Sequence, residues 1–195
     1  MKKRILGIAA IIAAIAFAGF ACGGGGGGGG TTYNIGDTGP GGGIIFYVDE
    51  AGFTMTDTGK TAHYLEAAPA DMPGTFVWAM PGYYDVIIPG TLTAIGTGKN
   101  NTGIILAALG GDSEAAFACD GSIVGGKTDW FLPSKDELNE LYKNKDIVGL
   151  VSDWYWSSSQ YNAQYYVWRQ NGDTGEQVTN SASNNPFKVR AIRAF

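Results

Sequence analysis

Cysteine and histidine are scarce in this chain of 195 residues, which contains two cysteines and a single histidine. Zinc sites in proteins combine several cysteine or histidine ligands, and His63 has no second histidine or thiol at such a spacing. A serine nucleophile would need His63 as its base, and no Gly-x-Ser-x-Gly motif is present to hold one. We therefore expect no metal, no cofactor and no enzymatic activity.

Positive charge is also limited, with 13 Lys and Arg residues against 18 Asp and Glu residues. Without residues 1–21, which include Lys2, Lys3 and Arg4, 10 basic residues face 18 acidic ones, giving a net charge of −8. Surfaces that bind nucleic acid are basic, so this balance predicts no nucleic-acid partner. It also argues against heavily sulfated polysaccharides, unless the few arginines cluster.

The start of the chain has the pattern of an export signal. Lys2 to Arg4 precede an uninterrupted run of apolar and small residues, 5–21, and Cys22 follows directly. This order is typical of a signal peptide, here residues 1–21, and the cysteine after it predicts lipid attachment at Cys22. Two alternatives stay open. Residues 5–21 are about long enough for an uncleaved transmembrane anchor, or the chain is released without lipid.

Eight consecutive glycines, residues 23–30, follow the proposed lipidation site. They have no side chains to bury, so we expect residues 22–32 to form a flexible tether that reaches on the order of 15–20 Å. Residues 33–195 are enough for one domain. If Cys22 is acylated, Cys119 has no intramolecular disulfide partner, and its apolar surroundings predict a buried small hydrophobe.

The residue patterns predict an α+β fold. Ser134 and Glu137 form a capping box, which predicts a helix over residues 135–143. Apolar residues at helical spacing predict another helix over 101–109, capped by Asn101 and Thr102, with a short restart up to residue 119. Strands are expected over residues 44–48, 64–68, 154–157, 165–169, 176–178 and 189–195. Residues 49–52 should end the first strand, and the last strand should pair near the first. Residues 171–175 should form the turn between the strands over 165–169 and 176–178.

Several motifs have a structural interpretation. Trp130 and Trp156 are expected in the core, with Tyr155 facing the opposite way from Trp156. Arg190 and Arg193 should face opposite sides of a strand, one in solvent and the other paired with a carboxylate such as Glu137. Residues 121–128 match a phosphate-binding loop formally, but such a loop needs a strand before it and a helix after it, and neither is expected here.

Together these segments resemble the Lcl C-terminal domain family, named for the C-terminal part of a collagen-like bacterial adhesin. The resemblance rests on residues 36–47, 64–69, 98–102, 130–134 with Glu137 and Leu138, 155–159 and 189–195. It implies a C-type-lectin-like α+β fold, with two helices packed on short antiparallel sheets and with paired terminal strands. It also implies a location in the cell envelope and, as in the named member, attachment to glycans.

The sequence departs from this family and its fold relatives in three ways. It has no collagen-like Gly-X-Y repeat, so trimer formation through such a stalk does not carry over and the oligomeric state stays open. It lacks the Glu-Pro-Asn, Gln-Pro-Asp and Trp-Asn-Asp motifs of calcium-dependent lectins. It also lacks the paired cysteines of the fold's oxidase relatives, since Cys119 stands alone in the domain.

Polar loop residues near exposed rings are the candidates for ligand binding. Rings stack on the apolar face of a sugar, and amides bond its hydroxyl groups. The candidates are Tyr161, Asn162, Gln164, Asn171, Asp173, Asn180, Asn184 and Asn185. The alternative is plain turn chemistry, because Asn and Asp favour turns in any case.

These observations predict a non-enzymatic surface lipoprotein whose lectin-like domain binds a glycan or a protein ligand. Its partner would be a membrane, to which the N-terminal lipid would attach it. Its location would be the outer membrane or the cell surface. A structural or assembly module of the envelope is the alternative, and an enzyme on a lectin-like scaffold is a third.

Overall fold

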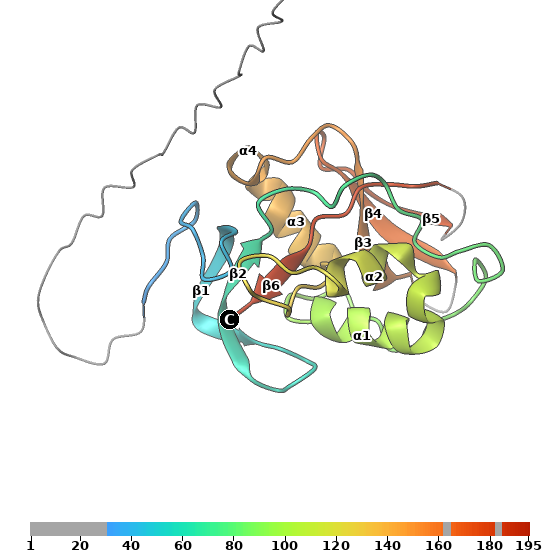
Figure 1. Ribbon diagram of the computed structural model, residues 1–195, viewed down its shortest axis with the longest axis horizontal. Coiled ribbons are helices and arrows are strands. Elements are labelled where there is room, and N and C mark those ends of the chain that lie inside the picture. The colour runs from blue at the N-terminus through green and yellow to red at the C-terminus, as the bar shows by residue number, and fades with distance from the viewer. Residues whose placement is uncertain (1–30, 162–164, 182–184) are drawn as a thin grey trace, which may run out of the picture. The chain divides into compact units, whose positions relative to one another are not determined.

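The computed structural model describes residues 31–161, 165–181 and 185–195. The expected signal peptide, Cys22 and the glycine tract lie outside the described residues, as do Asn162, Gln164 and Asn184. Residues Thr32–Phe195 form one compact unit of mixed α+β structure, with two small antiparallel sheets and four helices in its described part (Figure 1). Within the same ranges, no helix has the length and apolar character needed to cross a membrane.

The first sheet contains β1 (Ile44–Thr54), β2 (Thr61–Ala67) and β6 (Ile192–Ala194), with β2 in the centre. The first and last strands therefore share a sheet but do not pair with each other, which corrects the expectation of paired terminal strands. The two ends of the domain still meet, because the ring of Tyr33 packs edge-on against that of Phe195 at 5.5 Å.

β1 continues past residues 49–52, where the sequence predicted its end. The carboxylate of Asp49 accepts hydrogen bonds from the backbone N–H groups of Ala51 and Gly52, at 3.0 and 3.1 Å. The pairing register with β2 shifts between Val48 and Phe53 and then resumes. The polar turn residues thus form an irregularity inside the strand, as bulges do.

The second sheet contains β3 (Trp154–Gln160), β4 (Tyr166–Asn171) and β5 (Gln177–Ser181) in sequence order. The turn between β4 and β5 is the one predicted. The side-chain oxygen of Asn171 accepts from the backbone N–H groups of Asp173 and Thr174, both at 2.9 Å. Gly175 has a φ of 77°, which favours glycine at this position.

Four helices are present: α1 (Gly98–Leu109), α2 (Glu114–Asp120), α3 (Lys135–Lys143) and α4 (Lys145–Val148). α3 has the predicted bounds and both hydrogen bonds of its capping box. α3 lies between the sheets and contacts β1 on one side and β3 and β4 on the other (Figure 1). The structure adds two shorter helices to the two main helices that the sequence predicted. α2 was expected only as a short restart, and α4, which has four residues, was not expected.

α1 begins at Gly98, three residues before its predicted start, so Asn101 and Thr102 are not N-cap residues. Both are buried inside the helix. The amide of Asn101 bonds the backbone of Leu92 through both its oxygen and its nitrogen, at 2.9 and 2.7 Å. Polar residues that resemble caps in the sequence instead fix a neighbouring loop against α1.

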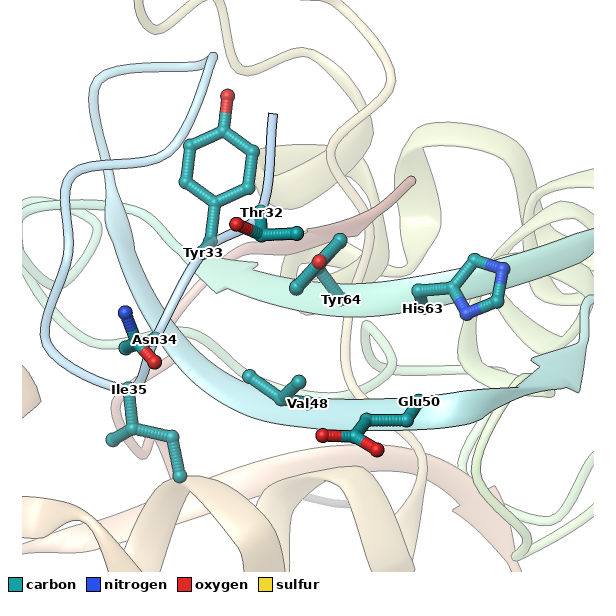
Figure 2. A pocket seen from close by; sticks show the side chains of 8 residues that line it. All are labelled: Thr32, Tyr33, Asn34, Ile35, Val48, Glu50, His63 and Tyr64. Atoms are coloured by element: carbon teal, nitrogen blue, oxygen red, sulfur yellow. The ribbon is translucent and has the colours of Figure 1, made fainter. Parts of the chain in front are cut away.

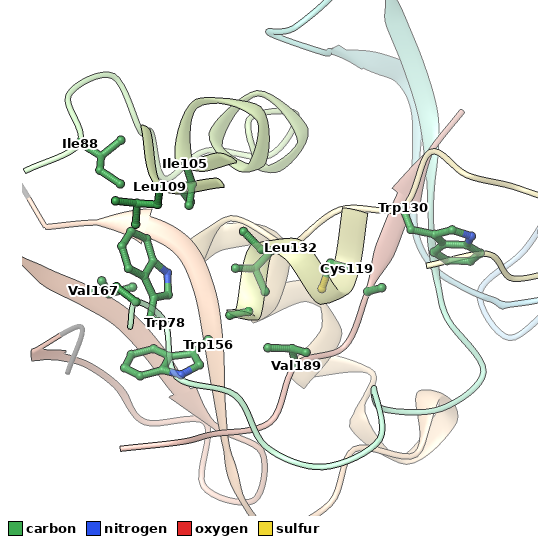
Figure 3. Close-up of a cluster of buried hydrophobic side chains, with 14 of the residues drawn as sticks. Trp78, Ile88, Ile105, Leu109, Cys119, Trp130, Leu132, Trp156, Val167 and Val189 are labelled. Carbon is green, nitrogen blue, oxygen red and sulfur yellow. The ribbon is translucent and has the colours of Figure 1, made fainter. Parts of the chain in front are cut away.

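The core consists of two clusters of buried side chains. One contains Trp78, Trp130 and Trp156 together with residues of α1 and α2 (Figure 3). The other lies between the first sheet and α3 and includes Tyr155. Trp130 and Trp156 are thus in the core as predicted, and Tyr155 contacts the opposite cluster from Trp156, as strand alternation requires.

Cys119 is fully buried in the first cluster. Burial, with a smaller contribution from Asp120, raises the pKa of the Cys119 thiol far above its ordinary value. The thiol therefore stays protonated and packs as a small apolar side chain, which confirms the prediction from the sequence.

Arg190 and Arg193 are both buried, so the prediction that one faces solvent was wrong. Arg190 Nε lies 2.7 Å from the carboxylate of Asp71. Arg193 pairs with Glu66 at 3.0 Å and with Asp129 at 2.9 Å. Neither contacts Glu137, the partner that the sequence suggested. These partners come from other segments, so their positions depend on the tertiary fold.

Glu137 accepts hydrogen bonds from the backbone N–H groups of Gly96 and Ser134, at 2.9 and 2.7 Å. Its side chain is fully buried. Burial raises the pKa of Glu137 to about 7, and the hydrogen bonds from Ser134, Gly96 and Gly98 oppose this rise only in part. Glu137 therefore stabilises a loop and a helix start, where an ion pair was expected.

Candidate functional site

The predicted ligand-binding residues that the structure describes do not form one site. Tyr161 lies where β4 begins, since its backbone N–H bonds the carbonyl of Tyr166 at 2.7 Å. Asn171 and Asp173 lie at the other end of β4, in the turn to β5. Five residues of strand separate these ends by roughly 17 Å. A single sugar residue could not contact both groups.

The turn residues mainly serve the protein itself. Asn171 holds the turn through its side-chain oxygen. The backbone carbonyl of Asp173 accepts from Lys145 Nζ at 2.7 Å, and its carboxylate lies 3.6 Å from the same nitrogen. These contacts match the alternative interpretation, in which Asn and Asp are present for turn chemistry.

Tyr161 borders a groove of about 330 Å³ that Gln160, Trp168 and the loop 88–93 also line. The Tyr161 and Trp168 rings meet edge-on, with centroids 5.6 Å apart. The side-chain amide of Gln160 is used internally, because it accepts from Ile88 at 2.7 Å and donates to Val86 at 2.9 Å. The groove offers aromatic surface, but much of its polar lining is already bonded.

Asn180 and Asn185 lie apart from this groove lining. Asn180 is on β5 and pairs in register with Val167 of β4. Asn185 is exposed and precedes Phe187, whose ring packs on Trp156 with centroids 4.8 Å apart. Neither side chain forms a hydrogen bond with another described residue.

A larger groove of about 630 Å³ lies beside the start of the domain, and we call it the terminal groove. Figure 2 shows how three segments line it: residues 32–35, part of β1 and part of β2. Its lining residues are Thr32, Tyr33, Asn34, Ile35, Val48, Glu50, His63 and Tyr64. None of the predicted ligand-binding residues lies here, because the groove is lined by segments that are separated along the chain.

The rings of Tyr33 and Tyr64 form one wall of the terminal groove, and Phe195 packs against both of them. Tyr64 stacks on Phe195 with centroids 5.2 Å apart, and Tyr33 packs edge-on against Tyr64 at 5.3 Å. Arg193 lies over the ring of Phe195 at 5.1 Å. The rings therefore pack on Phe195, which in turn contacts Arg193 of the buried ion pairs. This packing holds the rings of Tyr33 and Tyr64 in place beside the groove.

The polar groups of the terminal groove are largely uncommitted. Within the described residues, the Glu50 carboxylate and the hydroxyl groups of Tyr33 and Tyr64 have no hydrogen-bond partner. His63 Nδ1 lies 3.0 Å from the carbonyl of Asp49 and therefore carries the proton. In the neutral ring, His63 Nε2 is then left as an acceptor. Unlike the groove at Tyr161, this one combines aromatic surface with hydrogen-bonding groups available to a ligand.

The segment 121–128 does not have the geometry of a phosphate-binding loop. The helix α2 ends directly before it, at Asp120, and the next helix starts only at Lys135. Val124 and Lys127 instead form a tight backbone bridge. Among the described residues, no group of three or more His, Cys, Asp or Glu side chains could hold a metal ion.

Comparison with models of protein families finds no match for this chain, and comparison with curated proteins finds no similar sequence.

Proposed function

We propose that this chain is a non-enzymatic lipoprotein of the cell envelope whose folded domain binds a saccharide in the terminal groove. The observation that carries the proposal is the combination of ordered tyrosine rings with unpaired acceptors and hydroxyl groups in one groove. Glu50 is exposed and Tyr33, His63 and Tyr64 are half-buried, so their unoccupied hydrogen-bonding groups are open to a polar ligand in this groove.

The chemistry of the lining favours a sugar over an apolar ligand. The rings of Tyr33 and Tyr64 can pack against the C–H face of a sugar. The Glu50 carboxylate and His63 Nε2 can accept hydrogen bonds from sugar hydroxyl groups. Asn34 adds an exposed amide at the rim. A neutral sugar satisfies these groups without placing a second negative charge beside the Glu50 carboxylate.

The lining favours binding over chemistry. Glu50 is the single carboxylate among the residues that line the terminal groove. Most glycoside hydrolases need two, one on each side of the scissile bond. The lining also includes no serine or cysteine nucleophile. The groove can hold a saccharide, but it lacks the pair of groups that would cleave one.

We further propose that the domain adopts the C-type-lectin-like fold of the Lcl C-terminal domain family. Support comes from the α+β composition and from the sheet that joins both ends of the domain. The motifs of the resemblance have structural roles here: Glu66 and Arg193 form a buried ion pair, and Ser134 and Glu137 cap α3. Fold transfers between proteins more readily than function does, so the groove itself has to support the activity.

The test is binding of the purified full chain to an array of neutral glycans, followed by affinity measurements on any glycan retained. We expect Glu50→Gln to weaken binding about 10-fold, because the substitution removes a charged acceptor and keeps the shape. Glu176→Gln, which removes an exposed carboxylate from the turn before β5, is the matched control and should bind as the unmodified chain does.

Loss of affinity that is equal in both variants would assign the effect to overall charge and contradict the groove. If the chain binds a protein ligand and no glycan, the alternative of an assembly module in the envelope is favoured.

A further inference from the structure

Arg169, on β4, is packed against aromatic rings and has no acceptor. Its guanidinium carbon lies 4.0 Å from the ring centroid of Trp154 and 4.5 Å from that of Phe187. Packing of this kind orders the planar group and covers its surface. The N–H groups at its edge are what remain for a hydrogen-bonding partner.

The other two arginines in the described part of the chain are fully paired. Arg190 bonds Asp71 and backbone carbonyls, and Arg193 bonds Glu66 and Asp129. The side chain of Arg169 forms no hydrogen bond or ion pair with any described residue, and its Nε is buried without a partner. The Nη groups are not among the buried unpaired atoms, so they reach solvent.

The charge of Arg169 is partly removed from water without a counter-ion. Burial lowers the pKa of Arg169, and the Glu176 carboxylate opposes this shift without coming within ion-pair distance. A bound anion would offset the cost of this desolvation and would also satisfy unpaired donors.

An amide lies on the same face of the sheet. Arg169 pairs with Val178 of β5, and Asn180 pairs with Val167, two residues from Arg169 along β4. Because side chains alternate along strands, Asn180 and Arg169 share a face as diagonal neighbours. The side chain of Asn180 bonds no described residue, so it is free to contact a ligand held by Arg169.

We propose that Arg169 and Asn180 bind the carboxylate end of an acidic saccharide, such as a uronic acid. Two guanidinium N–H groups would donate to the two carboxylate oxygens in one plane, and the Asn180 amide would bond a neighbouring hydroxyl group. This site lies on the second sheet, so it is separate from the terminal groove and does not depend on it.

The test compares two ligands of the same backbone, oligogalacturonate and its methyl-esterified form. Calorimetric titration of the full chain should show saturable binding of the acid and binding at least about 10-fold weaker for the ester. This comparison needs no variant, so it stays informative even if substitutions at Arg169 impair folding. Equal affinity for both forms, or no saturable binding of the acid, would overturn the proposal.

Two variants then locate the site. Arg169→Lys keeps the positive charge but loses the planar fork, and we expect affinity for the acid to fall about 10- to 100-fold. Lys60→Gln removes an exposed positive charge elsewhere and should leave this affinity unchanged. An equal loss in both variants would show general charge attraction and refute the assignment. Loss of acid binding in Glu50→Gln would place the ligand in the terminal groove and refute it equally.

Discussion

Arg193 and Glu66 form an ion pair in the interior of the domain, with Arg193 Nη1 3.0 Å from Glu66 Oε2. Glu66 also accepts from the backbone N–H groups of Gly41 and Gly43, the shortest of these bonds being 2.6 Å. A Cβ atom on Gly39 would lie 2.5 Å from the Glu66 carboxyl carbon. The glycine-rich segment before β1 is therefore shaped to surround a buried carboxylate.

Removal of this carboxylate should destabilise the domain strongly. Glu66→Gln leaves part of the Arg193 charge buried without its partner, and we expect the free energy of unfolding to fall by about 3 kcal/mol. Asp57→Asn breaks the more exposed pair with Lys99, 3.6 Å long, and should cost less than about 1 kcal/mol. Urea denaturation of both variants measures the difference, and similar losses would contradict the structural role given to Glu66.

Two glycines of α1 should respond to alanine in opposite directions. A Cβ atom on Gly98 would lie 2.1 Å from Glu137 Oε2 and 2.8 Å from the backbone nitrogen of Ser134. We expect Gly98→Ala to reduce the free energy of unfolding by about 1–3 kcal/mol through overpacking. Gly103, in the same helix, has open space around it, so Gly103→Ala should stabilise by up to about 1 kcal/mol. Thermal unfolding would show whether the two shifts in Tm differ in sign.

The raised pKa of Glu137 predicts a contribution to stability that depends on pH. The pKa is about 7 in the folded state against an ordinary value of 4.5, so the folded state binds more protons between these values. The contribution of Glu137 is then complete below pH 4.5 and is lost as pH rises to 7. Measured by urea denaturation, the stability difference between the unmodified chain and Glu137→Gln should shrink over this range, by up to about 3 kcal/mol.

A difference that stays constant from pH 4.5 to 7.5 would contradict this prediction. Asp129 does not interfere within that window. Burial alone would raise the pKa of Asp129, but the hydrogen bond and charge of Arg193 lower it overall. The contribution of Asp129 to the free energy of unfolding is therefore complete above its ordinary pKa of 3.8 and is lost only at more acidic pH.

Lipid attachment can be tested directly at Cys22. Cells that express the chain should incorporate radioactive palmitate into it, and Cys22→Ser should abolish the label, because the acylated thiol is removed. Cys119→Ser is the matched control. It should keep the label, because Cys119 is buried in the folded domain. Label that persists in Cys22→Ser would reject the lipoprotein proposal.

The parts of the fold that the sequence predicted correctly depend on local signals. The capping box of Ser134 and Glu137 lies within one turn of helix, so it fixed the start of α3. The turn at Asn171 is equally local. The end of β1 was misplaced, because an aspartate that normally ends strands here supports an irregularity inside one.

The polar contacts that could not be predicted join residues far apart in the chain. Glu66 and Arg193 are 127 residues apart, and Arg190 and Asp71 are 119 apart. The terminal groove likewise combines Tyr33 with Glu50, His63 and Tyr64 from two strands. A single sequence contains the patterns for each strand but no signal for which side chains the sheet brings together. The asparagine-rich loops are visible in the sequence, whereas the terminal groove forms only in the fold.

The central position of β2 has a consequence for how the domain is made. Leu65 pairs with Ala194, so one edge of β2 stays without a partner until the ribosome has added more than a hundred further residues. Contacts at such sequence separation form slowly, and an open strand edge is a template for pairing with other chains. A partly synthesised chain therefore cannot complete this sheet, and the edge of β2 stays open to other strands until β6 has been made.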